Sequence, residues 1–235
     1  MPDIFDEVDQ DLRADRARAL WRRYGVLVIA AAVLVVVGVA GWEAWTWQQD
    51  RAAARAATEY IAATATPIAP GTDGHAARQA SVARLRDIVT KAPAGYRTLA
   101  RLRVAGLLAD DGDLAGADTE WDAVAADGAA PQSLRDLANL EWARHAVDAG
   151  DPAAVTARLR PLAGPQAPFH PLALETLALL SLRENKPDAA RDTLRQIAAD
   201  PATSPGLRGR TGKLLEQLGD PPLRDDVAPH AGPAS

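Results

Sequence analysis

The sequence contains no cysteine. Disulfides, thiolate metal sites, iron–sulfur clusters and cysteine nucleophiles are therefore excluded, although a cysteine-free chain fits an oxidising or a reducing compartment. Aromatic residues make up only 5% of the chain, and 31 acidic residues outnumber 26 basic ones, for a net charge of −5. Because a nucleic-acid-binding protein needs a basic face, we expect neither a basic face nor a nucleic-acid partner.

The apolar content is high but unevenly spread. Apolar residues make up 48% of the chain, yet the mean hydropathy is only −0.15, which excludes a multi-pass membrane protein. A length of 235 residues suits one domain, or a small domain with an appendage. With so few aromatics, the apolar residues are mainly alanine, leucine and valine, which is typical of closely packed helices.

One stretch has the properties of a membrane span. The 19 residues from Tyr24 to Trp42 carry no charge. As a helix they would extend about 28 Å, close to the hydrocarbon thickness of a bilayer. The run is flanked by aromatic residues, which favour the two lipid–water interfaces. These residues are Trp21, Tyr24, Trp42, Trp45 and Trp47.

The distribution of arginine predicts the orientation of this span. Five arginines lie in the 15 residues before it and two, Arg51 and Arg55, in the 15 after it. This bias places the N-terminus in the cytoplasm and the rest of the chain across the membrane. A cleaved signal peptide is the alternative, because Gly38-Val39-Ala40 offers small residues for cleavage. The long charged lead and the length of the apolar run favour an uncleaved signal anchor.

The remainder is predicted to be helical throughout. Residues 43–63 contain neither glycine nor proline and should continue the membrane helix, and Thr64–Gly74 is a break. Asp151 before Pro152 is a helix start, with an N-cap side chain and a proline at the first position. Short segments rich in proline, glycine and aspartate separate the helical stretches. The predicted helices are 75–91, 95–109, 114–126, 131–149, 152–162, 171–184, 188–199 and 205–218.

The helices after residue 95 repeat. Gly112, Gly150 and Asn185 take equivalent places after successive first helices, where a left-handed residue is expected to end the helix. The second helices that follow share a pattern of one small and two large apolar positions. These positions are Ala117, Trp121 and Val124, then Val155, Leu159 and Leu162, then Ala190, Leu194 and Ile197.

This pattern resembles the tetratricopeptide repeat (TPR), which has a unit of 34 residues. The repeat units are 98–131, 136–169 and 171–204, with residues 43–63 and 75–91 as a degenerate opening unit and 205–218 as a closing cap. Arg101 departs from the pattern, because a large aromatic residue is usual there. The predicted fold is therefore all-α: one N-terminal transmembrane helix followed by a TPR-like α-solenoid of antiparallel helix pairs.

No catalytic constellation is found. None of the four histidines has a metal-ligand neighbour at helical spacing, and the sequence has no nucleophile elbow, phosphate-binding loop or dinucleotide fingerprint. We predict that the protein is not an enzyme and has no catalytic residues, no cofactor, no metal and no small-molecule substrate.

The remaining candidate for function is the concave face formed by the first helix of each pair. In a repeat solenoid this face suits an extended peptide or a partner helix. Ordinary packing with a solvated polar rim is the alternative for each residue on it. The predicted partner-binding groove contains Leu102, Arg103, Gly106, Leu140, Glu141, Arg144, Glu175, Leu179 and Arg183.

The overall architecture resembles the ancillary SecYEG translocon subunit family of bacterial TPR-like proteins. The resemblance covers nearly the whole chain and is carried best by residues 3–12 (DIFDEVDQDL) and by residues 20–25 (LWRRYG) leading into the span. It implies a cytoplasmic tail (1–23), a transmembrane signal anchor in the inner membrane (24–42), a periplasmic TPR-like domain (43–218) and a disordered C-terminal tail (219–235).

The same resemblance implies a non-enzymatic, membrane-anchored periplasmic chaperone or adaptor that associates with the Sec translocon and assists exported clients. Two alternatives remain open: a periplasmic scaffold for envelope assembly or cell division, and an undetected hydrolase acting on the cell wall.

Overall fold

The computed structural model describes residues 4–65 and 74–220, with side chains from residue 24 onward apart from residues 25 and 28. Within these ranges the chain is helical and has no strand, which confirms the predicted all-α fold. The predicted ends of the helices after residue 75 agree with the observed ones to within three residues. The helices are α1 (Ile4–Thr64), α2 (His75–Lys91), α3 (Ala94–Asp110), α4 (Leu114–Ala125), α5 (Gln132–Ala146), α6 (Pro152–Leu159), α7 (His170–Arg183), α8 (Pro187–Ala199) and α9 (Pro205–Gln217).

Two predicted irregular segments fall largely outside the described residues. Helix α1 ends at Thr64 and α2 begins at His75, as the predicted break requires, but residues 66–73 are not described. Of the predicted C-terminal tail, only Gly219 and Asp220 are described.

The chain divides at Arg55 and Ala56 into two units. In the first unit, α1 carries a stretch that is long and apolar enough to cross a membrane, with a mean hydropathy of 1.8 and none of its most apolar window buried. A signal sequence near the N-terminus has the same properties. On α1, Trp42, Trp45 and Trp47 are exposed, and the Arg51 guanidinium lies 3.5 Å from the centre of the Trp47 ring.

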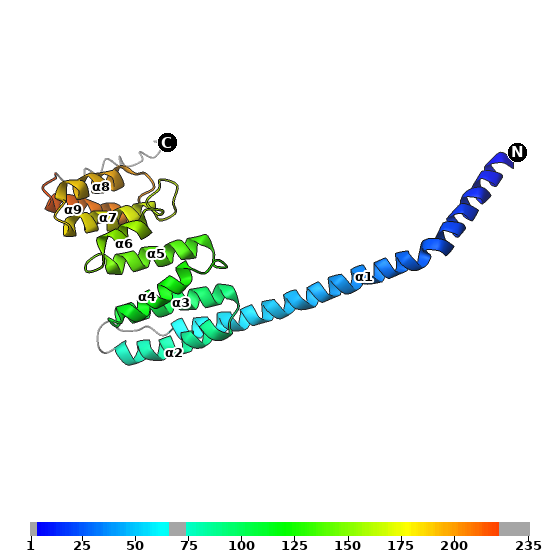
Figure 1. The fold of residues 1–235 in the computed structure, drawn as a ribbon, viewed down its shortest axis with the longest axis horizontal. Helices are drawn as coiled ribbons and strands as arrows, with labels where there is room; N and C mark the ends of the chain where they lie inside the picture. Colours follow the sequence, from blue (N-terminus) through cyan, green and yellow to red (C-terminus); the bar gives the residue numbers. More distant parts are fainter. Residues whose placement is uncertain (1–3, 66–73, 221–235) are drawn as a thin grey trace, which may run out of the picture. The chain divides into compact units, whose positions relative to one another are not determined.

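The second unit is built from helices that each contact their neighbours along the chain (Figure 1). It begins with the last turns of α1, where Ala56 and Ala63 lie in a core cluster with Val82, Leu85 and Ile88 of α2. Further clusters follow between α3, α4 and α5, then between α5, α6 and α7, and then between α7, α8 and α9. The core is thus distributed along the stack, as a solenoid requires.

The repeated apolar positions form this core. All nine positions of the predicted second-helix pattern are at most 2% exposed. In helix packing, a small residue allows two helices to approach closely and large residues fill the space between them, which accounts for this burial. The predicted register is therefore the one that the chain adopts.

Two of the three predicted left-handed residues are confirmed. Gly112 has φ of 83° and Asn185 has φ of 58°. The prediction for Gly150 is wrong, since this residue does not have a positive φ. A Cβ at Gly150 would lie 2.7 Å from the Ala146 carbonyl oxygen, so glycine is required there for close approach of the backbone.

The predicted start of α6 is confirmed in atomic detail. The Asp151 carboxylate accepts hydrogen bonds from the amides of Ala153 and Ala154, both at 3.2 Å, and Pro152 occupies the first turn. Asp113 caps α4 in the same way, accepting a hydrogen bond from the Gly116 amide at 2.9 Å. These side chains satisfy amides that the helix leaves without partners.

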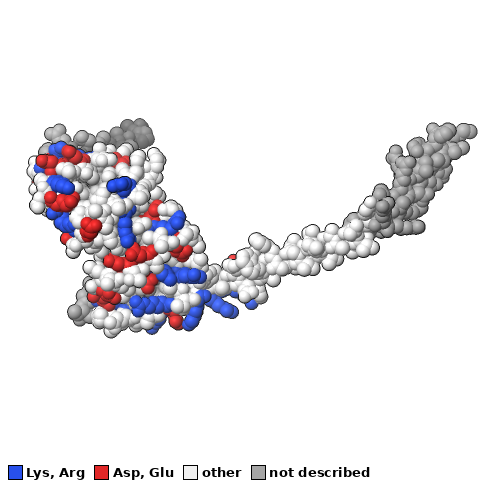
Figure 2. Space-filling model, viewed as in Figure 1, with Lys and Arg blue, Asp and Glu red and all other residues white. Residues whose placement is uncertain are grey.

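The expectation that the chain has no basic face is wrong. Residues 74–108, which comprise α2 and most of α3, carry seven basic side chains and one acidic side chain, for a net charge of +6. Residues 109–220 carry 11 basic and 18 acidic side chains, for a net charge of −7. Figure 2 shows the basic side chains gathered over α2 and α3. The total charge does not reveal this division, because the net charges of the two regions nearly cancel.

Candidate protein-binding surface

A cleft of about 730 Å³ lies between α5, α7 and α9. Its lining combines aliphatic and charged side chains, and none of these belongs to the second helix of a pair. The lining residues are Arg144, Val147, Asp148, Glu175, Thr176, Leu179, Arg210, Lys213 and Leu214. A cleft with this mixture can bury apolar side chains of a ligand and orient its polar groups.

The charges in the cleft differ in how they are held. Arg210 of α9 donates two hydrogen bonds to the Glu175 carboxylate, at 3.0 and 3.1 Å, and this contact raises the pKa of Arg210. Arg144 forms an ion pair with Glu141 at 3.1 Å. Lys213 is exposed and has no acidic partner among the described residues. The ammonium group of Lys213 is therefore the cation in the cleft that is available to a ligand.

A second, smaller depression of about 280 Å³ lies between α3, α4 and α5. Its lining includes Trp121 and His145, whose rings stack with centroids 5.0 Å apart. The other lining residues are Leu102, Gly106, Asp110, Leu137 and Glu141. Since Trp121 is only 2% exposed, the depression presents the imidazole of His145 more than the indole beneath it.

The predicted groove residues fall into several environments. Arg144, Glu175 and Leu179 come together in the larger cleft, and Leu102 and Glu141 line the smaller one. Arg103 is exposed on α3 but lines neither depression.

Two predicted groove residues have structural roles instead. Leu140 is only 1% exposed and lies in the core between α5, α6 and α7, so its inclusion in a surface groove is a correction. Arg183 donates hydrogen bonds to the carbonyl oxygens of Val147 and Gly150, both at 2.8 Å, and thereby ties the end of α7 to the turn after α5.

Sequence reasoning missed the contribution of α9. Arg210, Lys213 and Leu214 line the larger cleft, although residues 205–218 were expected only to close the solenoid. Their i, i+3, i+4 spacing places them on one side of the helix and could have indicated a shared surface.

The described histidines make ordinary contacts. The His170 ring is buried, with Nδ1 2.8 Å from the Ala163 carbonyl oxygen, and His75 lies 3.0 Å from the Asp111 carboxylate. Among the described residues, no group of three or more His, Cys, Asp or Glu side chains could hold a metal ion. His230 lies outside the described residues.

The Asp111 carboxylate contacts two basic side chains of α2, Arg78 and His75. Burial opposes ionisation of its carboxyl group, but hydrogen bonds from Arg78 and His75 outweigh this effect and lower the pKa of Asp111. The Arg78 side chain is only 7% exposed. The contact links α2 to the end of α3, so its role is to hold the first helices of the domain together.

Comparison with known proteins identifies the domain. A family model described as a tetratricopeptide repeat-like domain matches residues 18–140, just over half of the chain. No curated protein and no solved structure matches. The matched residues include the start of the repeat stack, where Ala117, Trp121 and Val124 pack as the repeat pattern requires. The chain therefore belongs to the tetratricopeptide repeat-like domain family.

Proposed function

We propose that this protein is a membrane-anchored adaptor whose repeat domain binds other proteins through the cleft between α5, α7 and α9. The observation that carries the proposal is the composition of that cleft, in which exposed Leu179 lies beside Lys213 and the Arg210–Glu175 pair. An extended segment with aliphatic and acidic side chains would match these groups. Repeat domains of this type generally act as interaction scaffolds.

The proposed topology is a single span at residues 24–42 of a bacterial inner membrane, with the N-terminus cytoplasmic and the domain periplasmic. The exposed aliphatic side chains of α1 and the excess of arginine before them support it. We further propose that the protein acts at the Sec translocon as a chaperone for exported proteins. The support for this step is the resemblance of the N-terminal stretch and of the architecture to the ancillary translocon subunit family.

The absence of cysteine makes the topology simple to test. A cysteine introduced at exposed Gln196 should react with a membrane-impermeant maleimide in intact spheroplasts, whereas one at Ala17 should react only after lysis. The reverse pattern would overturn the orientation. Release of the protein from membranes by carbonate, with a new N-terminus near residue 41, would show a cleaved signal peptide instead.

The partner can be trapped from the cleft itself. A photoreactive amino acid replacing Leu179 should give crosslinks in living cells to translocon subunits or exported proteins, while the same group at Gln196 on α8 should not. Crosslinks to division or envelope-assembly proteins would favour the alternative of a scaffold. Equal crosslinking from both positions would show that the cleft is not the binding site.

A further inference from the structure

Four of the seven basic side chains of the basic end, defined as residues 74–108, lack acidic partners among the described residues. Of the seven cations in this region, Arg78, Lys91 and Arg101 face Asp111, Asp87 and Glu120 respectively. The remaining four arginines are exposed and form no ion pair with any described residue. These are Arg84, Arg86, Arg97 and Arg103.

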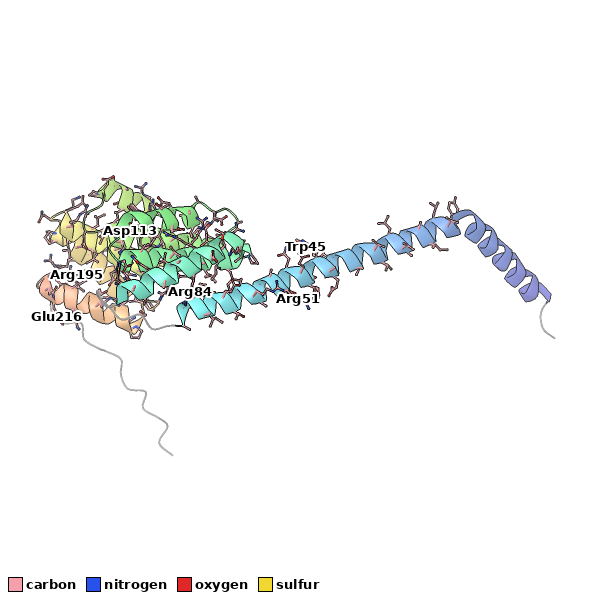
Figure 3. All side chains as sticks on the ribbon, turned by 90° about the horizontal axis from the view of Figure 1, so that it is seen from below. Trp45, Arg51, Arg84, Asp113, Arg195 and Glu216 are labelled. Atoms are coloured by element: carbon pink, nitrogen blue, oxygen red, sulfur yellow. The ribbon has the colours of Figure 1, made fainter. Side chains whose placement is uncertain are left out.

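This lack of pairing contrasts with the rest of the domain. In α8, Arg191 and Arg195 both contact the carboxylate of Asp220, and in α9 Arg210 is held by Glu175. The Asp220 contact raises the pKa of Arg195. Five of the nine arginines in residues 109–220 contact a carboxylate, whereas four of the six in the basic end form no ion pair and leave a positive potential directed at the solvent. Figure 3 labels Arg84 on α2 and Arg195 on α8.

The basic end also follows the candidate span more directly in the sequence than the acidic region does. Its helices α2 and α3 share a core cluster with Ala56 and Ala63 of α1. Ala56 follows the last flanking tryptophan, Trp47, by nine residues. Nine residues extend about 14 Å as a helix and about 30 Å when fully stretched, whatever the angle between the two units. A charged surface acts over a Debye length of about 8 Å in physiological salt, so contact with lipid headgroups requires the domain to turn its basic end towards the bilayer.

We infer that the basic end binds the anionic headgroups of the membrane surface that α1 enters, and that this contact orients the repeat domain. The inference rests on the proposed function, because it requires α1 to be a membrane span. Arginine guanidinium groups donate two parallel hydrogen bonds to a phosphate, and a basic cluster beside a span is attracted by anionic lipids. The net charge of −7 on residues 109–220 keeps that region, with the cleft, away from the same surface.

The experiment uses the full chain, reconstituted into vesicles of phosphatidylcholine with or without phosphatidylglycerol. A dye attached to a cysteine at exposed Ala80 of α2 reports energy transfer to an acceptor on the lipid headgroups. The same dye on a cysteine at Gln196 of α8 serves as the control position. Transfer from position 80 should rise with the anionic lipid and fall again in high salt, and transfer from position 196 should not rise.

Matched variants distinguish an effect of the basic end from an effect of the total charge of the chain. Replacement of Arg84, Arg86 and Arg103 by glutamine should abolish the rise, with a loss of about fivefold in the docking equilibrium for each arginine removed. Replacement of Arg160, Lys186 and Arg195 by glutamine removes the same net charge and should preserve the rise.

The possible failures are distinguishable. If the chain does not float with neutral vesicles after carbonate treatment, the proposed span is wrong. If it floats but the transfer from position 80 is independent of phosphatidylglycerol, only the lipid inference is overturned. If polyglutamate binds to the detergent-solubilised chain and not to the variant lacking Arg84, Arg86 and Arg103, while phosphatidylglycerol has no effect, the basic end binds an acidic protein instead.

Discussion

The aliphatic side chains of α1 and those of the repeat helices are of the same kinds but meet different surroundings. In α1, the exposed large aliphatic residues between Val26 and Val39 have 56–79% of their surface exposed. In the repeats, Val155, Leu159 and Leu194 have no exposed surface at all. Burying an aliphatic side chain contributes about 1.5–3 kcal/mol, so both sets require removal from water. In the repeats a neighbouring helix supplies the apolar surroundings, whereas the aliphatic residues of α1 between Val26 and Val39 stay exposed. A membrane span and a signal sequence both have this exposure, and the proposed span is the first of the two.

Charges in the span should have the largest effect, because they oppose its insertion into the membrane. Replacing Val35 and Val36 by arginine places two cations in the middle of the apolar run, each costing about 2.5–3.5 kcal/mol for insertion. We expect the protein to leave the carbonate-resistant membrane fraction, while the thermal unfolding of its repeat domain is unchanged. The same positions changed to leucine provide the control. Full membrane retention of the arginine variant would contradict a span at residues 24–42.

A cavity in the repeat core should destabilise the repeat domain without releasing the protein from the membrane. Leu194→Ala removes a side chain with no exposed surface from the core between α7, α8 and α9, which should lower the free energy of unfolding by about 2–5 kcal/mol. Membrane retention should persist. Leu114 is 45% exposed, so Leu114→Ala should change the free energy of unfolding by less than about 0.5 kcal/mol. Equal effects in denaturant titrations would show that the repeats are not packed as described.

The Asp111 contact should make stability depend on pH. The pKa of Asp111 is lowered in the folded state, so its contribution is complete above the pKa of the unfolded chain, near 4, and is lost as the pH falls through the folded value. Asp111→Asn should lower the melting temperature at neutral pH, and its difference from the natural protein should shrink below about pH 4. Asp110→Asn, at an exposed neighbouring position, should have little effect at any pH. A pH-independent difference would contradict this assignment.

Loss of a helix cap should have the smallest effect. Asp151→Ala leaves the amides of Ala153 and Ala154 without their acceptor and should lower the free energy of unfolding by about 0.5–2 kcal/mol. Asp148→Ala removes a nearby exposed carboxylate that caps no helix and serves as the control. If the two variants unfold at the same denaturant concentration, Asp151 does not stabilise α6.

Most of the fold could be predicted because local signals and core positions agree. Pro152, Pro187 and Pro205 each lie in the first turn of a helix, and Gly112 and Asn185 adopt the left-handed conformation that ends the preceding one. Gly150 was misjudged because its requirement is space beside Ala146, which only the packed backbone reveals. Arg101, at a position where the repeat usually has an aromatic residue, lies 3.8 Å from Glu120 of α4, a contact between helices that periodicity does not disclose.

The surfaces were less predictable, because a position on a helix does not determine its exposure. Leu140 has the spacing of a groove residue but lies beneath the neighbouring repeat, and Arg183 is occupied by two carbonyl oxygens. The cleft also depends on α9, whose packing against α8 cannot be derived from the repeat pattern. The division into a basic and an acidic region can be counted from the sequence once the helices are grouped, but the net charge of −5 for the whole chain does not reveal it.

The sequential order of the helix contacts has a consequence for how the domain is made. Each helix of the second unit packs mainly against the helix before it and the helix after it, so contacts form between residues that are close in the chain. Closing such short loops costs little entropy, and a chain of low contact order folds quickly. As synthesis proceeds from α2 towards α9, every new helix finds its partner already in place. The domain can therefore assemble one helix at a time, without waiting for its C-terminus.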